Sequence, residues 1–193
     1  MGAMKVLITE EELQSRIVEL AQQIDREYEG REITLISILK GSVFFAVELA
    51  KNISGPVKFE FIKVSSYGSS TESTGEIKMD LDLHGSIRGK EVLVVEDIID
   101  TGKTLSYLLK YLNTKEPKSI KLCTLLDKPE RRLVDVDVNY VGFAIPDEFV
   151  VGFGLDFNEE YRNLPYIGYF EKEISPETTE PPKRLTNKPI IKK

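Results

Sequence analysis

The sequence predicts an α/β fold in which helices cover both faces of a mostly parallel β-sheet. Near-continuous apolar runs of strand length occur at residues 33–39, 92–95 and 119–126, and segments of helical periodicity lie between them. Strands that are apolar along their whole length are typical of parallel sheets, because such sheets are buried on both faces. The length of 193 residues suits one domain with its own hydrophobic core.

Local signals justify the elements in order. Thr9 and Glu12 form a capping box ahead of apolar residues at helical spacing, which predicts a helix over residues 10–28. Residues 33–39 predict a strand, which a turn and a helix over 43–52 follow. The segment 65–75 is small and polar with two glycines, and it predicts a long mobile loop. The other predictions are strands at 57–64, 77–83, 92–95 and 119–126, a helix at 103–113, and shorter apolar stretches at 138–145, 149–153 and 166–170.

The two chain ends differ in composition from the rest. Residues 1–3 precede a second methionine, Met4, and are interpreted as a remnant of cloning. Four of the nine prolines lie after Ile174, so residues 174–193 are expected to form a flexible, polar tail. A single domain over residues 4–173, with its core at about 30–150, is therefore expected.

Composition excludes several classes of protein. The chain has 26 Lys and Arg against 32 Asp and Glu, and this acidic balance argues against nonspecific binding to nucleic acid. Cys123 is the only cysteine, so no disulfide can form within the chain. With His84 as the only histidine, zinc lacks ligands, and any metal is expected to be a hard cation bound by oxygen. No apolar run approaches the ~20 residues that span a membrane, and no secretory signal is recognisable, so we expect a cytosolic protein.

An acidic cluster follows the predicted strand at 92–95. The carboxylates of Glu96, Asp97 and Asp100 lie within five residues, at the carboxyl end of a strand, where ligands bind in parallel sheets. Adjacent carboxylates need a partner when buried, and Mg²⁺ or sugar hydroxyls are the candidates. The turn at 101–104 then opens a helix. Its backbone N–H groups would form a cradle for one phosphate, with Gly102 permitting the tight turn.

Two common nucleotide-binding motifs do not fit this chain. Gly102-Lys103-Thr104 ends like a Walker A loop, but Asp97 stands where that motif requires glycine. Gly152 and Gly154 begin like a dinucleotide-binding fingerprint, but Phe157 occupies the third glycine position. A solvated strand end with Asp100 as a helix cap would need no ligand at all. Three carboxylates beside a glycine turn favour a ligand site over this solvated strand end.

Residues 94–104 (VVEDIIDTGKT) resemble the phosphoribosyl-diphosphate motif of type I phosphoribosyltransferases. Three further segments resemble the hypoxanthine-guanine branch of that family: residues 39–42 (LKGS), residues 65–68 (SSYG), and residues 147–156 (DEFVVGFGLD) with Arg162 beyond them. The resemblance covers about residues 5–170 with the motifs in order. It implies the type I phosphoribosyltransferase fold, a twisted and mostly parallel sheet with a small hood from the N- and C-terminal segments.

The resemblance also implies the activity. Such enzymes move ribose 5-phosphate from 5-phosphoribosyl 1-diphosphate onto a 6-oxopurine, giving IMP or GMP and pyrophosphate in purine salvage. By similarity, Asp100 is the general base or acid at the purine N7. Mg²⁺ is the implied cofactor, and the residues implied to bind it are Glu96, Asp97 and Asp156. Glu96 and Asp97 are also implied to bind the ribose hydroxyls, directly or through the ion. The implied contacts to the 5-phosphate are Thr101, Gly102, Lys103 and Thr104.

Further roles follow from the same resemblance. Lys40, Gly41 and Arg162 are implied to bind pyrophosphate, and Lys40 to form a cis peptide bond with the preceding residue. The implied purine site consists of Ile98, Lys128, Phe149, Val150 and Asp156. Lys128 would select a 6-oxo acceptor, Phe149 would stack on the base, and Val150 would offer backbone groups. The loop that contains Ser66 and Tyr67 would close over the site and exclude water.

Several alternatives stay open at this point. A nucleotide-sensing regulator that keeps this fold and binds RNA or DNA would need a basic face or a helix-turn-helix, and one acidic helix precedes the first predicted strand. Preference for xanthine is open too, because xanthine also has a 6-oxo group for Lys128. The family forms homodimers or homotetramers as a rule, but the sequence does not show the interface. His84 is interpreted as a turn residue.

Overall fold

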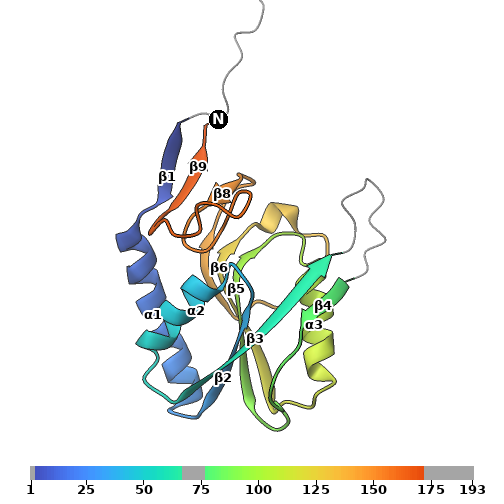
Figure 1. Ribbon diagram of the computed structural model, residues 1–193. Coiled ribbons are helices and arrows are strands. Elements are labelled where there is room, and N and C mark those ends of the chain that lie inside the picture. Colours follow the sequence, from blue (N-terminus) through green and yellow to red (C-terminus); the bar gives the residue numbers. More distant parts are fainter. Residues whose placement is uncertain (1–2, 67–76, 172–193) are drawn as a thin grey trace, which may run out of the picture.

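A six-stranded sheet forms the core of the computed structural model, which describes residues 3–66 and 77–171 (Figure 1). Five neighbouring strands are parallel, as predicted, and β4 at one edge is antiparallel to β3. The strand order is β4 (Ile77–Leu81), β3 (Val57–Ser66), β2 (Ile33–Ile38), β5 (Glu91–Ile99), β6 (Ser119–Asp127) and β7 (Tyr140–Ala144).

Helices cover both faces of this sheet because its central strands bury side chains on both sides. All six residues of β2 are buried. Leu35 and Leu93 pack with α1 (Glu10–Tyr28) and α2 (Val43–Asn52) on one face. Ile36 and Val94 pack with α3 (Lys103–Asn113) on the other. Each such side chain contributes about 1.5–3 kcal/mol when fully buried, so this double layer supplies most of the driving force for folding.

The first helix begins where the capping box predicts. The Glu12 amide donates to the Thr9 hydroxyl at 3.2 Å, and the Thr9 amide donates to the Glu12 carboxylate at 2.8 Å. The observed bounds of α1, α2 and α3 agree with the predicted helices at 10–28, 43–52 and 103–113.

A second, small sheet forms a hood from the two ends of the described chain. Its order is β1 (Met4–Ile8), β9 (Ile167–Phe170) and β8 (Val150–Val151), and both pairings are antiparallel. Figure 1 shows this sheet set apart at one end of the core. The sequence did not indicate β1, whose register pairs Met4 with Phe170. Most of β1 faces outward, so its strand conformation depends on a partner that local signals cannot specify.

Strand limits differ from the predictions at several points. β5 continues through the acidic cluster to Ile99, because Ile98 and Ile99 still pair with β6. The strand predicted at 77–83 ends at Leu81, and the stretch at 149–153 contributes only the two residues of β8. The predicted loop at 65–75 lies for the most part outside the described residues, as do Tyr67, the side chain of Ser66 and the predicted tail. Within the part that the structure describes, no helix is long and apolar enough to cross a membrane.

Candidate active site

Two cavities lie at the carboxyl edge of the core sheet, and Asp100 lines both. The first, of about 330 Å³, is enclosed by the loop after β2, the end of β5 with the start of α3, and the hood. The second, of about 460 Å³, lies between the end of β6 and the hood. The predicted site residues that line the first are Lys40, Gly41, Glu96, Asp97, Ile98, Asp100, Thr101, Gly102, Thr104, Asp156 and Arg162. Those that line the second are Asp100, Lys128 and Phe149.

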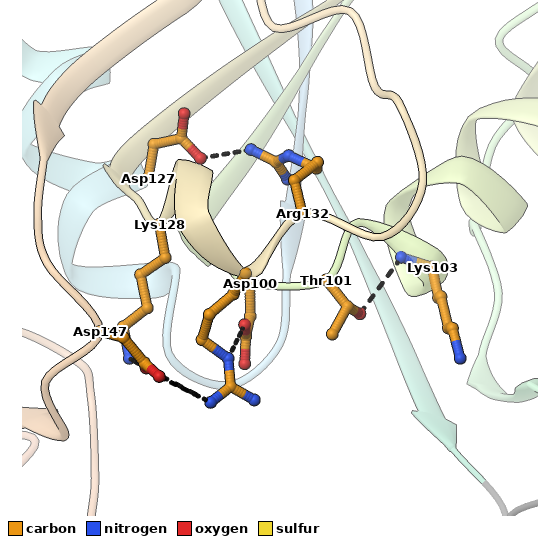
Figure 2. A network of polar contacts seen from close by, with 8 residues as sticks. Asp100, Thr101, Lys103, Asp127, Lys128, Arg132 and Asp147 are labelled. Atoms are coloured by element: carbon orange, nitrogen blue, oxygen red, sulfur yellow. Dashed lines mark hydrogen bonds and ion pairs between the residues drawn. The ribbon is translucent and has the colours of Figure 1, made fainter.

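The turn between β5 and α3 has the geometry of an anion cradle. Gly102 has φ of 81°, and a Cβ there would lie 2.6 Å from the Val134 carbonyl oxygen, so the turn requires glycine. The Lys103 amide faces the Thr101 hydroxyl at 3.5 Å (Figure 2). No side chain caps the start of α3, which leaves its first-turn amides open to an anion in the first cavity. Lys103, which was predicted to contact the phosphate, is exposed and does not line the cavity.

Glu96 and Asp97 place two carboxylates in the wall of the first cavity. Burial raises the pKa of Glu96 well above its usual value, and the neighbouring Asp97 carboxylate raises it further. Burial also raises the pKa of Asp97, although its Oδ1 accepts a hydrogen bond from the Ile98 amide at 2.8 Å. Within the described residues, the buried Oε2 of Glu96 has no hydrogen-bond partner. This Glu96 oxygen therefore lacks a positive charge or donor that a ligand could supply.

Three segments meet closely beside these carboxylates. A Cβ on Gly41 would lie 1.6 Å from Asp97 Oδ2, and a Cβ on Gly154 would lie 2.0 Å from the Gly41 carbonyl oxygen. The Leu39–Lys40 peptide bond is cis, as the resemblance implies. The loop after β2, the end of β5 and the hood thus meet at one point, and only glycine fits there.

Lys40 and Arg162 bring positive charge to the first cavity from two segments, the loop after β2 and the hood. Lys40 Nζ donates to Glu159 Oε2 at 2.7 Å. Arg162 Nη2 lies 2.8 Å from Asp156 Oδ1 and 3.4 Å from Glu159 Oε1, and Nη1 donates to the Gly154 carbonyl at 2.7 Å. Glu159 is not among the predicted site residues. Nothing in its local sequence shows that it reaches Lys40.

The second cavity has a charged wall formed by four side chains. Arg131 Nε donates to Asp100 Oδ1 at 2.5 Å, and its Nη1 lies 3.2 Å from Asp147 Oδ2. Lys128 is 8% exposed, and its Nζ lies 3.5 Å from Asp147 Oδ1. Figure 2 shows Lys128, Asp147 and Asp100 on neighbouring segments around this wall. Arg131 lines this cavity although it was not among the predicted site residues; the available sequence signal was its position three residues after Lys128, beyond the end of the predicted strand at 119–126.

An aromatic surface faces the charged wall. Phe149 is 57% exposed, and Phe157 meets its ring edge-on at a centroid distance of 5.6 Å. This arrangement leaves ring surface on which a planar ligand can stack. Two predicted purine contacts lie elsewhere: Ile98 lines the first cavity, and Val150 is buried in β8 without lining either cavity. Asp156, predicted for both metal and base, lines only the first.

Comparison with known proteins agrees with this geometry. The profile of the family described as "Phosphoribosyl transferase domain" matches residues 8–158. The bifunctional protein TilS/HprT of Listeria monocytogenes is 51% identical over 170 residues, which cover 88% of this chain; the chain spans only 26% of that protein's length. The hypoxanthine-guanine phosphoribosyltransferase of Mycobacterium avium is 49% identical over 175 residues, covering 88% of this chain and 86% of the relative.

A solved structure confirms the fold. The hypoxanthine-guanine phosphoribosyltransferase of Bacillus anthracis superposes with a TM-score of 0.83 at 53% identity, covering 86% of this chain and 98% of that one. The type I phosphoribosyltransferase fold expected from the sequence is therefore the fold of this chain. The match of the family profile includes the whole core sheet and most of the residues that line the two cavities. On these grounds the chain belongs to the phosphoribosyl transferase domain family.

Proposed function

We propose that this chain transfers ribose 5-phosphate from 5-phosphoribosyl 1-diphosphate to hypoxanthine or guanine, forming IMP or GMP and pyrophosphate. One observation carries the proposal: Asp100 lines both an anion-binding cavity and a cavity with a lysine and an open aromatic ring. A sugar phosphate in the first cavity and a purine in the second would meet at this carboxylate. The relatives that carry the name hypoxanthine-guanine phosphoribosyltransferase support the same substrates.

In the first cavity the chain would bind and orient the sugar. The amides of the turn at 101–104 would bind the 5-phosphate, and the hydroxyls of Thr101 and Thr104, which line this cavity, would add donors. Lys40 and Arg162 would hold the diphosphate, with the guanidinium fork suited to phosphate oxygens. These contacts would place the leaving group and the attacking base on opposite sides of the sugar C1 carbon.

In the second cavity the chain would select the base and move one proton. The Lys128 ammonium can donate to a 6-oxo group, whereas adenine offers no acceptor at that position. Phe149 would stack on the ring. Asp100 would take or return the proton at N7 as the bond to the sugar forms. Arg131, which already binds Asp100 Oδ1, would keep that carboxylate aimed between the two cavities.

Glu96 and Asp97 fit a hard cation such as Mg²⁺. They are adjacent carboxylates with raised pKa values, and one buried oxygen has no hydrogen-bond partner among the described residues. Within residues 3–66 and 77–171, no three His, Cys, Asp or Glu side chains form a ready metal site, so the substrate and water would complete the ligand set. When bound, Mg²⁺ would offset the negative charge of the leaving diphosphate. Asp156, which pairs with Arg162, is the third residue proposed for this role.

The test is a phosphoribosyltransferase assay with hypoxanthine, guanine, xanthine and adenine, with and without Mg²⁺. We expect turnover of the first two bases only in the presence of the ion, and xanthine turnover would widen the substrate class. Asp100→Asn should lose about 10²–10⁴-fold in turnover while it retains binding of IMP. Asp135→Asn, an exposed control of the same chemistry, should match the unsubstituted protein. Turnover of Asp100→Asn at the control level would remove Asp100 from proton transfer.

A further inference from the structure

Glu159 occupies a position between the two cations assigned to the diphosphate. Its Oε2 accepts from Lys40 Nζ at 2.7 Å, and its Oε1 lies 3.4 Å from Arg162 Nη2. Its backbone amide donates to Asp156 Oδ2 at 2.9 Å, which ties this turn of the hood to the cavity wall. One carboxylate thus links a cation from the loop after β2 with a cation from the hood.

The Glu159 side chain lies where it can move away from Lys40 and Arg162. Its side chain is 64% exposed, and it does not line the first cavity, whereas Lys40 and Arg162 do. An anion that enters the cavity therefore meets Lys40 already paired with Glu159 from the solvent side. It meets Arg162 paired with Glu159 at 3.4 Å and with Asp156 of the cavity wall at 2.8 Å. The Glu159 carboxylate and a diphosphate are both anions and compete for the same two cations, so a diphosphate gains the full interaction with both only when it displaces this carboxylate.

We propose that Glu159 is an internal competitor of the diphosphate: it pairs Lys40 and Arg162 in the free protein and lowers the affinity for phosphoribosyl diphosphate and for pyrophosphate. This inference rests on the proposed function. Glu159 acts through Lys40 and Arg162 and is thus a positioning residue. A nucleoside monophosphate lacks the diphosphate, so Glu159 sets the affinity for diphosphate ligands without changing the affinity for IMP.

The size of the effect follows from the exposure of the pairs. Solvent screens exposed ion pairs, and one such pair shifts an equilibrium by about fivefold at most. Glu159→Gln keeps the shape of the side chain and removes its charge. We therefore expect the Kd values of phosphoribosyl diphosphate and pyrophosphate to fall about fivefold in Glu159→Gln, with the Kd of IMP unchanged.

Calorimetric titration of phosphoribosyl diphosphate, pyrophosphate and IMP into the full chain, in buffer with Mg²⁺, tests this inference. Glu160→Gln is the matched control, because it removes the same charge at the neighbouring position. Unlike Glu159, the Glu160 side chain forms no ion pair within the described residues. Steady-state assays add a second readout: the KM for phosphoribosyl diphosphate should fall in Glu159→Gln while the KM for hypoxanthine stays the same.

Three results would overturn the inference while the proposed function stands. These are diphosphate affinities equal to those of the unsubstituted protein, weaker diphosphate binding in Glu159→Gln, or an equal gain in Glu160→Gln. Weaker binding would mean that Glu159 orients the cations for the ligand, and an equal gain would reflect net charge alone. If the unsubstituted protein binds none of the three ligands, the proposed function fails and this inference fails with it.

Discussion

Replacing Lys128 by methionine tests how the second cavity would select its base. Lys128 is 8% exposed, and its Nζ lies 3.5 Å from Asp147 Oδ1, which is long for a hydrogen bond. The ammonium carries three N–H donors, so this one distant contact leaves donors for a 6-oxo group. Methionine keeps an apolar stem of similar length and removes both the charge and the donors.

The expected loss follows from the energy of a charged hydrogen bond. Such a bond contributes about 1.5–3 kcal/mol, and every 1.36 kcal/mol is tenfold in rate. The kcat/KM for hypoxanthine should therefore fall about 10- to 150-fold in Lys128→Met. Any rate with adenine should not fall, since adenine offers no acceptor at this position. Because the existing ion pair is long, the free energy of unfolding should change by less than about 1 kcal/mol.

The assay compares kcat/KM for hypoxanthine and adenine in the unsubstituted protein, in Lys128→Met and in Lys110→Met. Lys110 is an exposed lysine of α3 and serves as the matched control. Denaturant unfolding of all three proteins reports whether the fold is retained. A folded Lys128→Met protein with unchanged kcat/KM for hypoxanthine would refute the role of this ammonium. So would a parallel loss with both bases.

Two further predictions concern packing and pH. Gly41→Ala should abolish most activity and lower the free energy of unfolding by about 2 kcal/mol, because the added Cβ would lie 1.6 Å from Asp97 Oδ2. Gly55→Ala is the control, because its Cβ would meet no atom nearer than 3.4 Å. Equal denaturation midpoints for Gly41→Ala and Gly55→Ala would contradict the close packing at Gly41. Glu91→Gln should lower the free energy of unfolding by about 1 kcal/mol at pH 7, because a hydrogen bond from Lys118 lowers the pKa of Glu91 below 4.5. A lowered carboxyl pKa stabilises the fold above the pKa of the unfolded chain, and this stabilisation is lost as the pH falls through the folded value. A difference in urea unfolding that did not shrink as the pH was lowered from 7 into the acidic range would contradict this assignment.

Local chemistry explains why most of the fold was predictable. The capping box at Thr9 places the start of α1, and both of its hydrogen bonds are present. The apolar run of β2 is buried throughout and residues 122–126 of β6 are buried as well, because helices cover both faces of the sheet. The end of β5 was predicted four residues early, since the polar Glu96 and Asp97 resemble the end of a strand. The pairing of β5 with β6 nevertheless continues to Ile99.

The hood shows where local chemistry is insufficient. β1 is largely exposed, and Met4 pairs with Phe170 at the other end of the described chain. Such a strand gains its hydrogen bonds from a distant segment, so neither periodicity nor propensity identifies it. β8, with two residues, is too short for any pattern to show.

The candidate site also has a part that local sequence predicts and a part that depends on distant segments. The sequence by itself determined the turn at 101–104 and the carboxylates before it, because a glycine turn at a strand end is a local feature with its own backbone geometry. Only the tertiary structure decided that Arg131 binds Asp100 and that Glu159 binds Lys40, partners that lie 31 and 119 residues apart in the chain. Charged side chains on loops carry no periodic signal, and their partners depend on which loops the folded sheet and hood bring together.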